Sequence, residues 1–143
     1  MTLHNQALYF TTTDSPVGHL TLVASDAGVR AILWEAEGEH VRVRFATAGA
    51  VEQPDHPVLT DAVGQLGQYF AGERREFDLP LDTVGTEFQR SAWTALRTIP
   101  FGATVSYGEQ ARRLGNPKAV RAVGAGNGRN PVSIVVPCHR VVG

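Results

Sequence analysis

The stretch SYGEQARRLGNPKAVRAVGAG, residues 106–126, decides the fold of the second half of the chain. Ser106-Tyr-Gly-Glu109 has the pattern of a capping box, in which a serine and a glutamate three residues later close the start of a helix. Leu114-Gly115 ends that helix, and Asn116-Pro117 supplies an N-cap and a first-position proline for another, which runs to about Gly126. Two short helices joined by a glycine-containing turn predict a helix-turn-helix.

The residues on either side of this stretch extend the helical part of the chain. Thr86-Glu-Phe-Gln89 is a second capping box, and the helix that it starts has apolar residues at helical spacing along one face: Phe88, Ala92, Trp93, Leu96 and Ile99. After the helix-turn-helix, the apolar run Pro131–Val136 predicts a short strand that ends next to Cys138. We therefore expect one helical domain over residues 86–143.

The first half of the chain has a different pattern. Leu8–Thr12, Leu20–Ala24 and Val29–Trp34 are strand-like runs separated by turn signals, and they predict an antiparallel meander. Residues 36–56 are expected to form a loop with a short helix at 39–46. Pro57 to Gly72 has helical spacing, and Phe77–Leu81 suggests a last strand. Residues 1–82 are therefore expected to form an α/β domain, with a linker at 82–85.

Composition excludes several classes of protein. Apolar residues make up 43% of the 143 residues, enough for a folded core, but no run approaches the roughly 20 residues that cross a bilayer. The N-terminus lacks the features of a secretory signal, and a single cysteine forms no internal disulfide, so we expect a cytoplasmic protein. No metal site is expected, because the histidines other than the one beside the cysteine show no ligand spacing: His4, His19, His40 and His56.

The net charge of −1 conceals a strong asymmetry. Residues 1–85 carry five basic and twelve acidic side chains, a net charge of −7, whereas residues 86–143 carry eight basic and two acidic ones, a net charge of +6. A segregated basic half is compatible with a nucleic-acid partner. Charge alone fits two ordinary solvated faces equally well.

Cys138 is the candidate nucleophile. His139 and Arg140 follow it directly, and cationic neighbours favour the thiolate, the form of cysteine that attacks electrophiles. The alternative is a buried structural thiol, since free cysteine is among the most buried residue types.

The stretch Ile134–Val142 resembles the active-site signature of the O6-alkylguanine-DNA alkyltransferases. Six other segments resemble the same family, in order and at its spacing: Phe88–Trp93, Ile99–Gly102, Val105–Tyr107, Gly115–Ala119, Arg121–Gly124 and Asn127–Pro131. Ser15–Thr21 and Tyr69–Glu73 match more weakly. Several motifs in register discriminate far better than any single one, so the resemblance favours the nucleophile over the structural thiol.

The resemblance implies a fold and an activity. The fold is an N-terminal α/β domain resembling ribonuclease H, followed by an α-helical domain with a winged helix-turn-helix. The activity is DNA repair by stoichiometric transfer of an alkyl group, such as methyl, from O6-alkylguanine to Cys138, after the damaged base is flipped out of the duplex. The expected partner is double-stranded DNA, bound through its minor groove by a monomer that needs no cofactor.

The resemblance also implies roles for single residues. Cys138 accepts the alkyl group, His139 withdraws the thiol proton through a water molecule, and Tyr107 donates a proton or hydrogen bond to the base. Arg121 fills the gap left in the stack by the flipped base. Lys118 and Ala122 are expected to bind DNA, and Val141 and Ser133 to lie at the substrate pocket. Asn130 is expected to tie the recognition helix, which is the second helix of the helix-turn-helix, to the turn that carries Cys138.

The sequence departs from the family at two places. The family continues beyond the position of Gly143 with a Gly- and Tyr-containing loop and a helix whose glutamate orients the histidine, so we expect the given sequence to lack the family's C-terminal tail. Val120 stands where the family usually has alanine, and a β-branched side chain there is expected to narrow the approach to the minor groove.

Three other functions compete with this hypothesis. A lesion-binding protein of the same fold would lack the cysteine. A helix-turn-helix transcription regulator would normally read the major groove as a dimer, and no dimerisation helix is evident. A thiol hydrolase would need a separate His/Asn pair, and none occurs at a suitable spacing.

Overall fold

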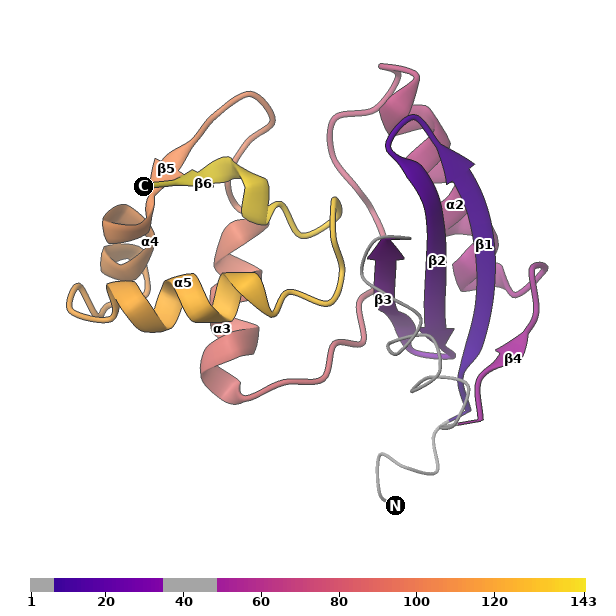
Figure 1. Cartoon of the computed structure of the whole chain (residues 1–143), viewed down its shortest axis with the longest axis horizontal. Helices are drawn as coiled ribbons and strands as arrows, with labels where there is room; N and C mark the ends of the chain where they lie inside the picture. Colours follow the sequence, from indigo (N-terminus) through magenta and orange to yellow (C-terminus); the bar gives the residue numbers. More distant parts are fainter. Residues whose placement is uncertain (1–6, 35–48) are drawn as a thin grey trace. The chain divides into compact units, whose positions relative to one another are not determined.

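The structure is a computed structural model that describes residues 7–34 and 49–143 (Figure 1). The short helix expected at 39–46 lies outside these residues. The chain divides into two compact units, Met1–Thr83 and Val84–Gly143. Among the described residues, every helix is too short or too polar to cross a membrane.

The first unit is built on a four-stranded sheet. Strands β1 (Tyr9–Ser15), β2 (Gly18–Ser25) and β3 (Gly28–Trp34) form the antiparallel meander that the sequence predicts, and β4 (Val51–Glu52) pairs in parallel with β1. The strand order is β3-β2-β1-β4, so β2 lies inside the sheet.

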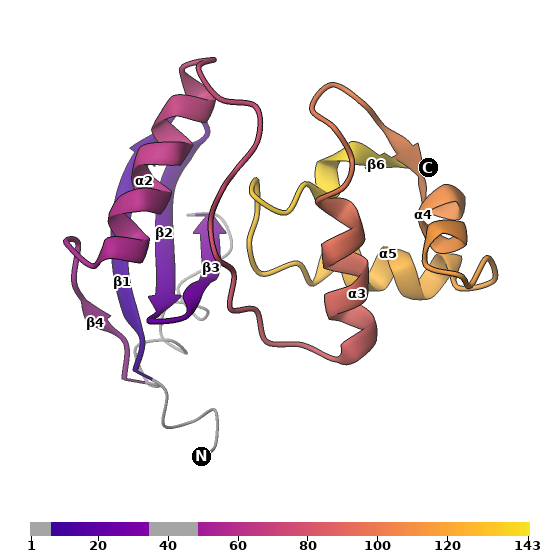
Figure 2. The ribbon, with the colours of Figure 1, turned by 180° about the vertical axis from the view of Figure 1, so that it is seen from behind.

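Both faces of this sheet are covered near β2. Helix α2 (Pro57–Phe70) packs across β1, β2 and β3, as Figures 1 and 2 show from opposite sides, and buries Leu59 and Leu66. A second cluster is formed by Leu8, Val23, Ala31 and Leu33, with Phe10 and Ala50 packed against it. Because side chains alternate between the faces of a strand, these two layers explain why every residue from Leu20 to Ser25 is buried.

Phe77–Leu81 does not form the expected strand. Only Leu81 makes a bridge, to Val29, supported by hydrogen bonds from Val29 N to Pro80 O (2.8 Å) and from Asp82 N to Val29 O (2.9 Å). Pro80 has no N–H to donate, so a regular ladder cannot continue through it. The segment pairs with β3 at one point and then leaves the first unit.

The second unit contains three helices and a small sheet. Helices α3 (Glu87–Leu96), α4 (Tyr107–Arg113) and α5 (Val120–Gly128) pack against one another, and α4 with α5 forms the predicted helix-turn-helix (Figure 2). Strands β5 (Val105–Ser106) and β6 (Val141–Val142) pair in parallel. Between α5 and β6 lies the short 3-10 helix η3 (Cys138–Arg140).

The two predicted capping boxes differ in how completely they form. At α3 both halves are present: Thr86 Oγ1 accepts from Gln89 N, and Gln89 Oε1 accepts from Thr86 N. At α4 Ser106 Oγ accepts from Glu109 N (3.0 Å), but the Glu109 carboxylate pairs with the last-turn arginines Arg112 and Arg113. Opposite charges one turn apart on a helix attract, which explains the preference of Glu109 for its helical neighbours.

Helix α5 begins at Val120, later than the expected start at Pro117. Gly115 N donates to Arg112 O and Asn116 N donates to Ala111 O, the two bonds of a Schellman motif that ends α4. Gly115 has the positive φ of +79° that this motif requires. Asn116 therefore closes α4 through its backbone N–H, and its carbonyl accepts from Ala119 N in the single turn that precedes α5, whose N-cap is Ala119.

Gly28 tests the pairing between β3 and the segment at Pro80. A Cβ at Gly28 would lie 2.6 Å from Pro80 O and 2.9 Å from Leu81 N, both backbone atoms that cannot turn aside. We expect Gly28→Ala to lower the free energy of unfolding by about 1–3 kcal/mol, measured by urea denaturation. The control is Gly67→Ala on the exposed face of α2, where a Cβ meets nothing within 4 Å and helix propensity should add roughly 0.5–1 kcal/mol. Equal stabilities of the two variants would contradict this account of the pairing.

Candidate active site

Cys138 lies at the end of a turn formed by residues 131–137, called here the active-site turn. Cys138 is half-buried and is the first residue of η3. Its backbone N–H donates to Val136 O (2.9 Å) across Pro137, whose φ of −85° and ψ of 67° are those of an inverse γ-turn. The chain therefore bends sharply just before the thiol.

Asn130 holds the active-site turn together. Its Nδ2 donates to Val136 O (2.7 Å), and its Oδ1 accepts from Val132 N (2.9 Å). Val136 N in turn donates to Val132 O (3.0 Å). One side chain thus bonds to both ends of the turn, immediately after α5 ends.

These bonds explain why Pro131–Val136 is not the strand that its composition suggests. Val132 N and Val136 O are bound by Asn130, so neither is available to a neighbouring strand. Ile134 has a φ of +73°, and Val135 N donates to Ser133 O (2.8 Å), which reverses the chain. A β-branched residue with positive φ is strained by about 1–3 kcal/mol, and the hydrogen bonds of Asn130 offset this cost.

Arg140 and Val141 fix the other side of Cys138. Arg140 is buried, its Nη1 donates to Ile99 O (2.6 Å), and its guanidinium carbon lies 5.7 Å from the centre of the Phe101 ring. Val141 is also buried and pairs with Val105 in the β5–β6 sheet. Its side chain therefore belongs to the core, and only its backbone can face a substrate. Ser133 is half-buried in the active-site turn.

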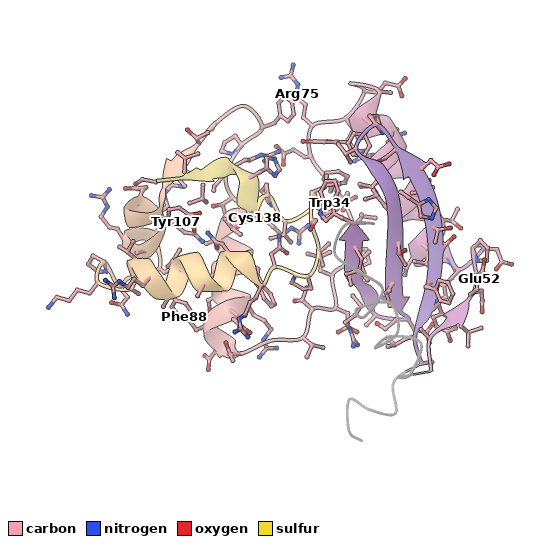
Figure 3. All side chains as sticks on the ribbon, viewed as in Figure 1. Trp34, Glu52, Arg75, Phe88, Tyr107 and Cys138 are labelled. Carbon is pink, nitrogen blue, oxygen red and sulfur yellow. The ribbon has the colours of Figure 1, made fainter. Side chains whose placement is uncertain are left out.

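Tyr107 is joined to Cys138 through the β5–β6 sheet. Tyr107 is the first residue of α4 and directly follows β5, while Cys138 is the first residue of η3, which leads directly into β6. The two side chains are labelled in Figure 3, which shows both within the second unit. Tyr107 is half-buried and packs over Gly124 of α5, where a Cβ would lie 3.9 Å from the ring.

His139 is an exposed residue whose electrostatic surroundings favour the neutral ring. Burial of part of the imidazole lowers its pKa below the ordinary value of 6.5, and the adjacent positive charge of Arg140 lowers the pKa further. At pH 7 the ring is therefore mostly neutral and has a nitrogen free to accept a proton.

The residues expected to bind DNA gather at the start of α5. Lys118, Arg121 and Ala122 are all exposed, and Val120 between them is 40% exposed. Within residues 7–34 and 49–143, neither Lys118 nor Arg121 takes part in an ion pair. Both cations are thus available to an anionic partner.

Sequence reasoning gave no role to a buried amide pair in the same unit. Gln110 and Asn127 are both buried and hydrogen-bond to each other in both directions, at 3.1 and 2.8 Å. The sequence feature that could have indicated a buried Gln110 is its position, one helical turn after Tyr107 and next to the apolar Ala111. Among the described residues, no cluster of three or more His, Cys, Asp or Glu side chains could hold a metal ion.

Comparison with known proteins identifies the family. Two family models match: the ribonuclease-like domain of 6-O-methylguanine DNA methyltransferase over residues 8–83, and the DNA binding domain of the same protein over residues 87–143. The chain is 49% identical over 134 residues to the methylated-DNA--protein-cysteine methyltransferase of Mycolicibacterium paratuberculosis, with 94% of this chain and 78% of the relative covered. It is 43% identical over 135 residues to the constitutive enzyme of Bacillus subtilis, with 94% and 81% covered.

Solved structures of similar fold belong to the same family. The O6-methylguanine methyltransferase of Mycobacterium tuberculosis superposes with a TM-score of 0.84 at 45% identity, covering 95% of this chain and 79% of that one. The same organism's OGT in complex with DNA gives a TM-score of 0.82 at 44% identity, with 94% and 78% covered.

Fold and matches together define a DNA-repair methyltransferase. The chain belongs to the 6-O-methylguanine DNA methyltransferase family. The expected fold is confirmed: an α/β domain resembling ribonuclease H, followed by a helical domain with a winged helix-turn-helix.

Asn130→Asp tests the hydrogen bonds that shape the active-site turn. The substitution keeps an oxygen for Val132 N but puts a second oxygen against Val136 O, where Nδ2 now donates at 2.7 Å. We expect a loss of about 1–3 kcal/mol in the free energy of unfolding, measured by thermal or urea denaturation. The control is Asn116→Asp in the exposed turn before α5, which makes the same change of charge. If the two variants are equally stable, Asn130 does not hold the turn.

Proposed function

We propose that this chain repairs DNA by transferring one alkyl group from O6-alkylguanine to Cys138, once per molecule, after flipping the damaged base out of the duplex. The observation that carries the proposal is the half-buried Cys138 at the end of a turn held by Asn130, within a region that matches the family's DNA binding domain. The names of the relatives agree, since they are called methylated-DNA--protein-cysteine methyltransferases.

The proposed reaction is an in-line displacement at the alkyl carbon. The sulfur of Cys138 forms a bond to this carbon as the bond from carbon to guanine O6 breaks, and the electron pair of that bond goes to the guanine. His139 accepts the thiol proton, and Tyr107 donates a proton or hydrogen bond to the departing base. Atoms and charges balance without a cofactor. A thioether does not hydrolyse, so the protein acts once.

Two features of the site support these roles. The lowered pKa of His139 keeps the imidazole neutral near pH 7, which is the form that accepts a proton. The pairing of Val105 with Val141 in the β5–β6 sheet links the start of α4, and with it Tyr107, to the segment that follows Cys138. In this proposal Ser133 and the backbone of Val141 border the base.

The proposed partner is the minor groove of double-stranded DNA, bound by one copy of the chain in the cytoplasm. Lys118, Arg121 and Ala122 are exposed at the start of α5, and the short side chain of Ala122 permits close approach to the groove. Arg121 is proposed to enter the stack and occupy the space that the flipped base leaves. Flipping costs a few kcal/mol, and filling the vacancy offsets part of that cost. Asn130 then links α5 with the turn that carries the nucleophile.

Cys138→Ser tests the chemistry. The parent protein, incubated with duplex DNA that contains O6-methylguanine, should gain the mass of one methyl group, and peptide mass spectrometry should locate it on Cys138. The variant should gain no mass but bind the same DNA with little change, because the groups that contact phosphate remain. Undiminished methylation of the serine variant would refute Cys138 as the acceptor. A parent that binds the lesion without gaining mass would instead be a lesion-binding protein.

Arg121→Ala tests base flipping. If Arg121 fills the vacated stack, the variant should repair duplex DNA far more slowly but keep most of its activity on the free alkylated base, which needs no flipping. The loss should be smaller when the lesion lies opposite a poor pairing partner, since extrusion then costs less. Single-turnover rates on the three substrates measure this. The control, Arg129→Ala, removes another exposed arginine just after α5. Equal losses on all three substrates would exclude the role of Arg121 in flipping.

A further inference from the structure

Three helices of the second unit meet at the buried pair Gln110 and Asn127, called here the amide pair. Gln110 Nε2 donates to Asn127 Oδ1 (3.1 Å), and Asn127 Nδ2 donates to Gln110 Oε1 (2.8 Å), so each amide both donates and accepts. Gln110 Nε2 also lies 3.4 Å from Ala92 O of α3. The exposed fractions of Gln110 and Asn127 are only 2% and 5%, so water does not compete for these bonds.

A second contact between α4 and α5 lies next to the amide pair. One helical turn before Gln110, Tyr107 packs over Gly124, which lies one turn before Asn127. Residues three apart lie on the same side of a helix, so the contacts Tyr107–Gly124 and Gln110–Asn127 follow one another along the same interface. A shift of α5 along α4 would break the amide pair and move Tyr107 off Gly124 together.

The amide pair also closes a ring of contacts, called here the circuit, that connects α4, the β5–β6 sheet, Cys138, the active-site turn and α5. From α4 the circuit passes back through β5 to its partner β6, and from β6 to Cys138. From Cys138 it passes through the active-site turn and the bonds of Asn130 to the end of α5. The amide pair joins α5 to α4 again. Within the described part of the chain, the amide pair supplies the side-chain hydrogen bonds between α4 and α5, and these are directional whereas apolar contacts are not.

We propose that Gln110 and Asn127 are positioning residues that fix the register of α5 against α4, and through it the placement of Arg121 relative to Tyr107 and Cys138. This inference rests on the proposed function. In this inference the pair selects one packing of α5 against α4. Buried polar pairs have this role in some other proteins, while their net contribution to the free energy of folding is often small.

The decisive variant replaces both amides by apolar side chains of similar size, Gln110→Met with Asn127→Leu. Replacing both partners leaves no unpaired amide, so the melting temperature should stay close to that of the parent. The methyl-transfer rate on duplex DNA should nevertheless fall by about 10- to 100-fold, because small misplacements of positioned groups cost rates of this order. The rate on free O6-methylguanine should fall much less, since free base needs no Arg121 in the stack and the β5–β6 sheet still links Tyr107 to Cys138.

The ratio of the duplex rate to the free-base rate is therefore the measured quantity. A matched variant exchanges the two amides, Gln110→Asn with Asn127→Gln, and keeps the total side-chain length and the hydrogen-bonding groups. It should recover most of the parent's ratio. An exchanged pair that performs as poorly as the apolar pair, or an apolar pair with the parent's ratio, would overturn the inference.

If the apolar double variant does not fold, Asn127→Ala assayed well below its melting temperature decides by the same ratio: a reduced ratio supports the inference and an unchanged ratio overturns it. If the parent itself transfers no methyl group from the free base or the duplex to Cys138, the proposed function fails rather than the inference drawn from it.

Discussion

The second unit depends on the hydrogen bonds that Asn130 makes with Val132 and Val136. These two bonds hold the active-site turn in a conformation that its own residues disfavour, with Ile134 at a φ of +73°. The turn then delivers Cys138 at the start of η3, between the end of α5 and the β5–β6 sheet. The strain at Ile134 and the compensating bonds lie close to Cys138, the proposed nucleophile, and stored backbone strain is commonly found at active sites.

Other hydrogen bonds of the second unit hold the helices and η3 around this turn. Trp93 of α3 donates its indole N–H to Gly126 O of α5 (2.9 Å), and the buried Arg140 reaches Ile99 O just beyond α3. The side chains of Trp93 and Arg140 are both buried, and a buried polar group that makes no hydrogen bond is costly. These hydrogen bonds are directional, so they help to set how the helices and the turn are oriented.

Hydrogen bonds within the first unit hold the segment at which the chain leaves it. Asp82, where the chain leaves this unit, accepts hydrogen bonds from Ser25 Oγ and from Arg30 through both its carboxylate and its backbone oxygen. The unit is acidic and the second unit basic, so an anionic partner is attracted to the second unit and repelled by the first. Under the proposed function, this charge division favours encounters in which the DNA meets the helix-turn-helix.

The sequence by itself determined the features that rest on local bonds. The starts of α3 and α4 follow from Thr86 and Ser106, because a cap bonds to a residue only three positions away. The meander follows from apolar runs separated by short turn signals. Cys138 was a candidate nucleophile from its neighbours His139 and Arg140, and the resemblance of the 134–142 stretch favoured that role over a buried thiol.

Tertiary structure decided the features in which distant or competing partners take part. Pro131–Val136 looks like a strand, but Asn130 binds the groups that a strand would use, and Asn116 closes α4 instead of starting α5. The bond between Gln110 and Asn127 joins residues 17 positions apart. A pattern of residue types does not specify which of several available partners a polar group will bind. That choice depends on which groups the folded chain brings within about 3 Å of one another while excluding water.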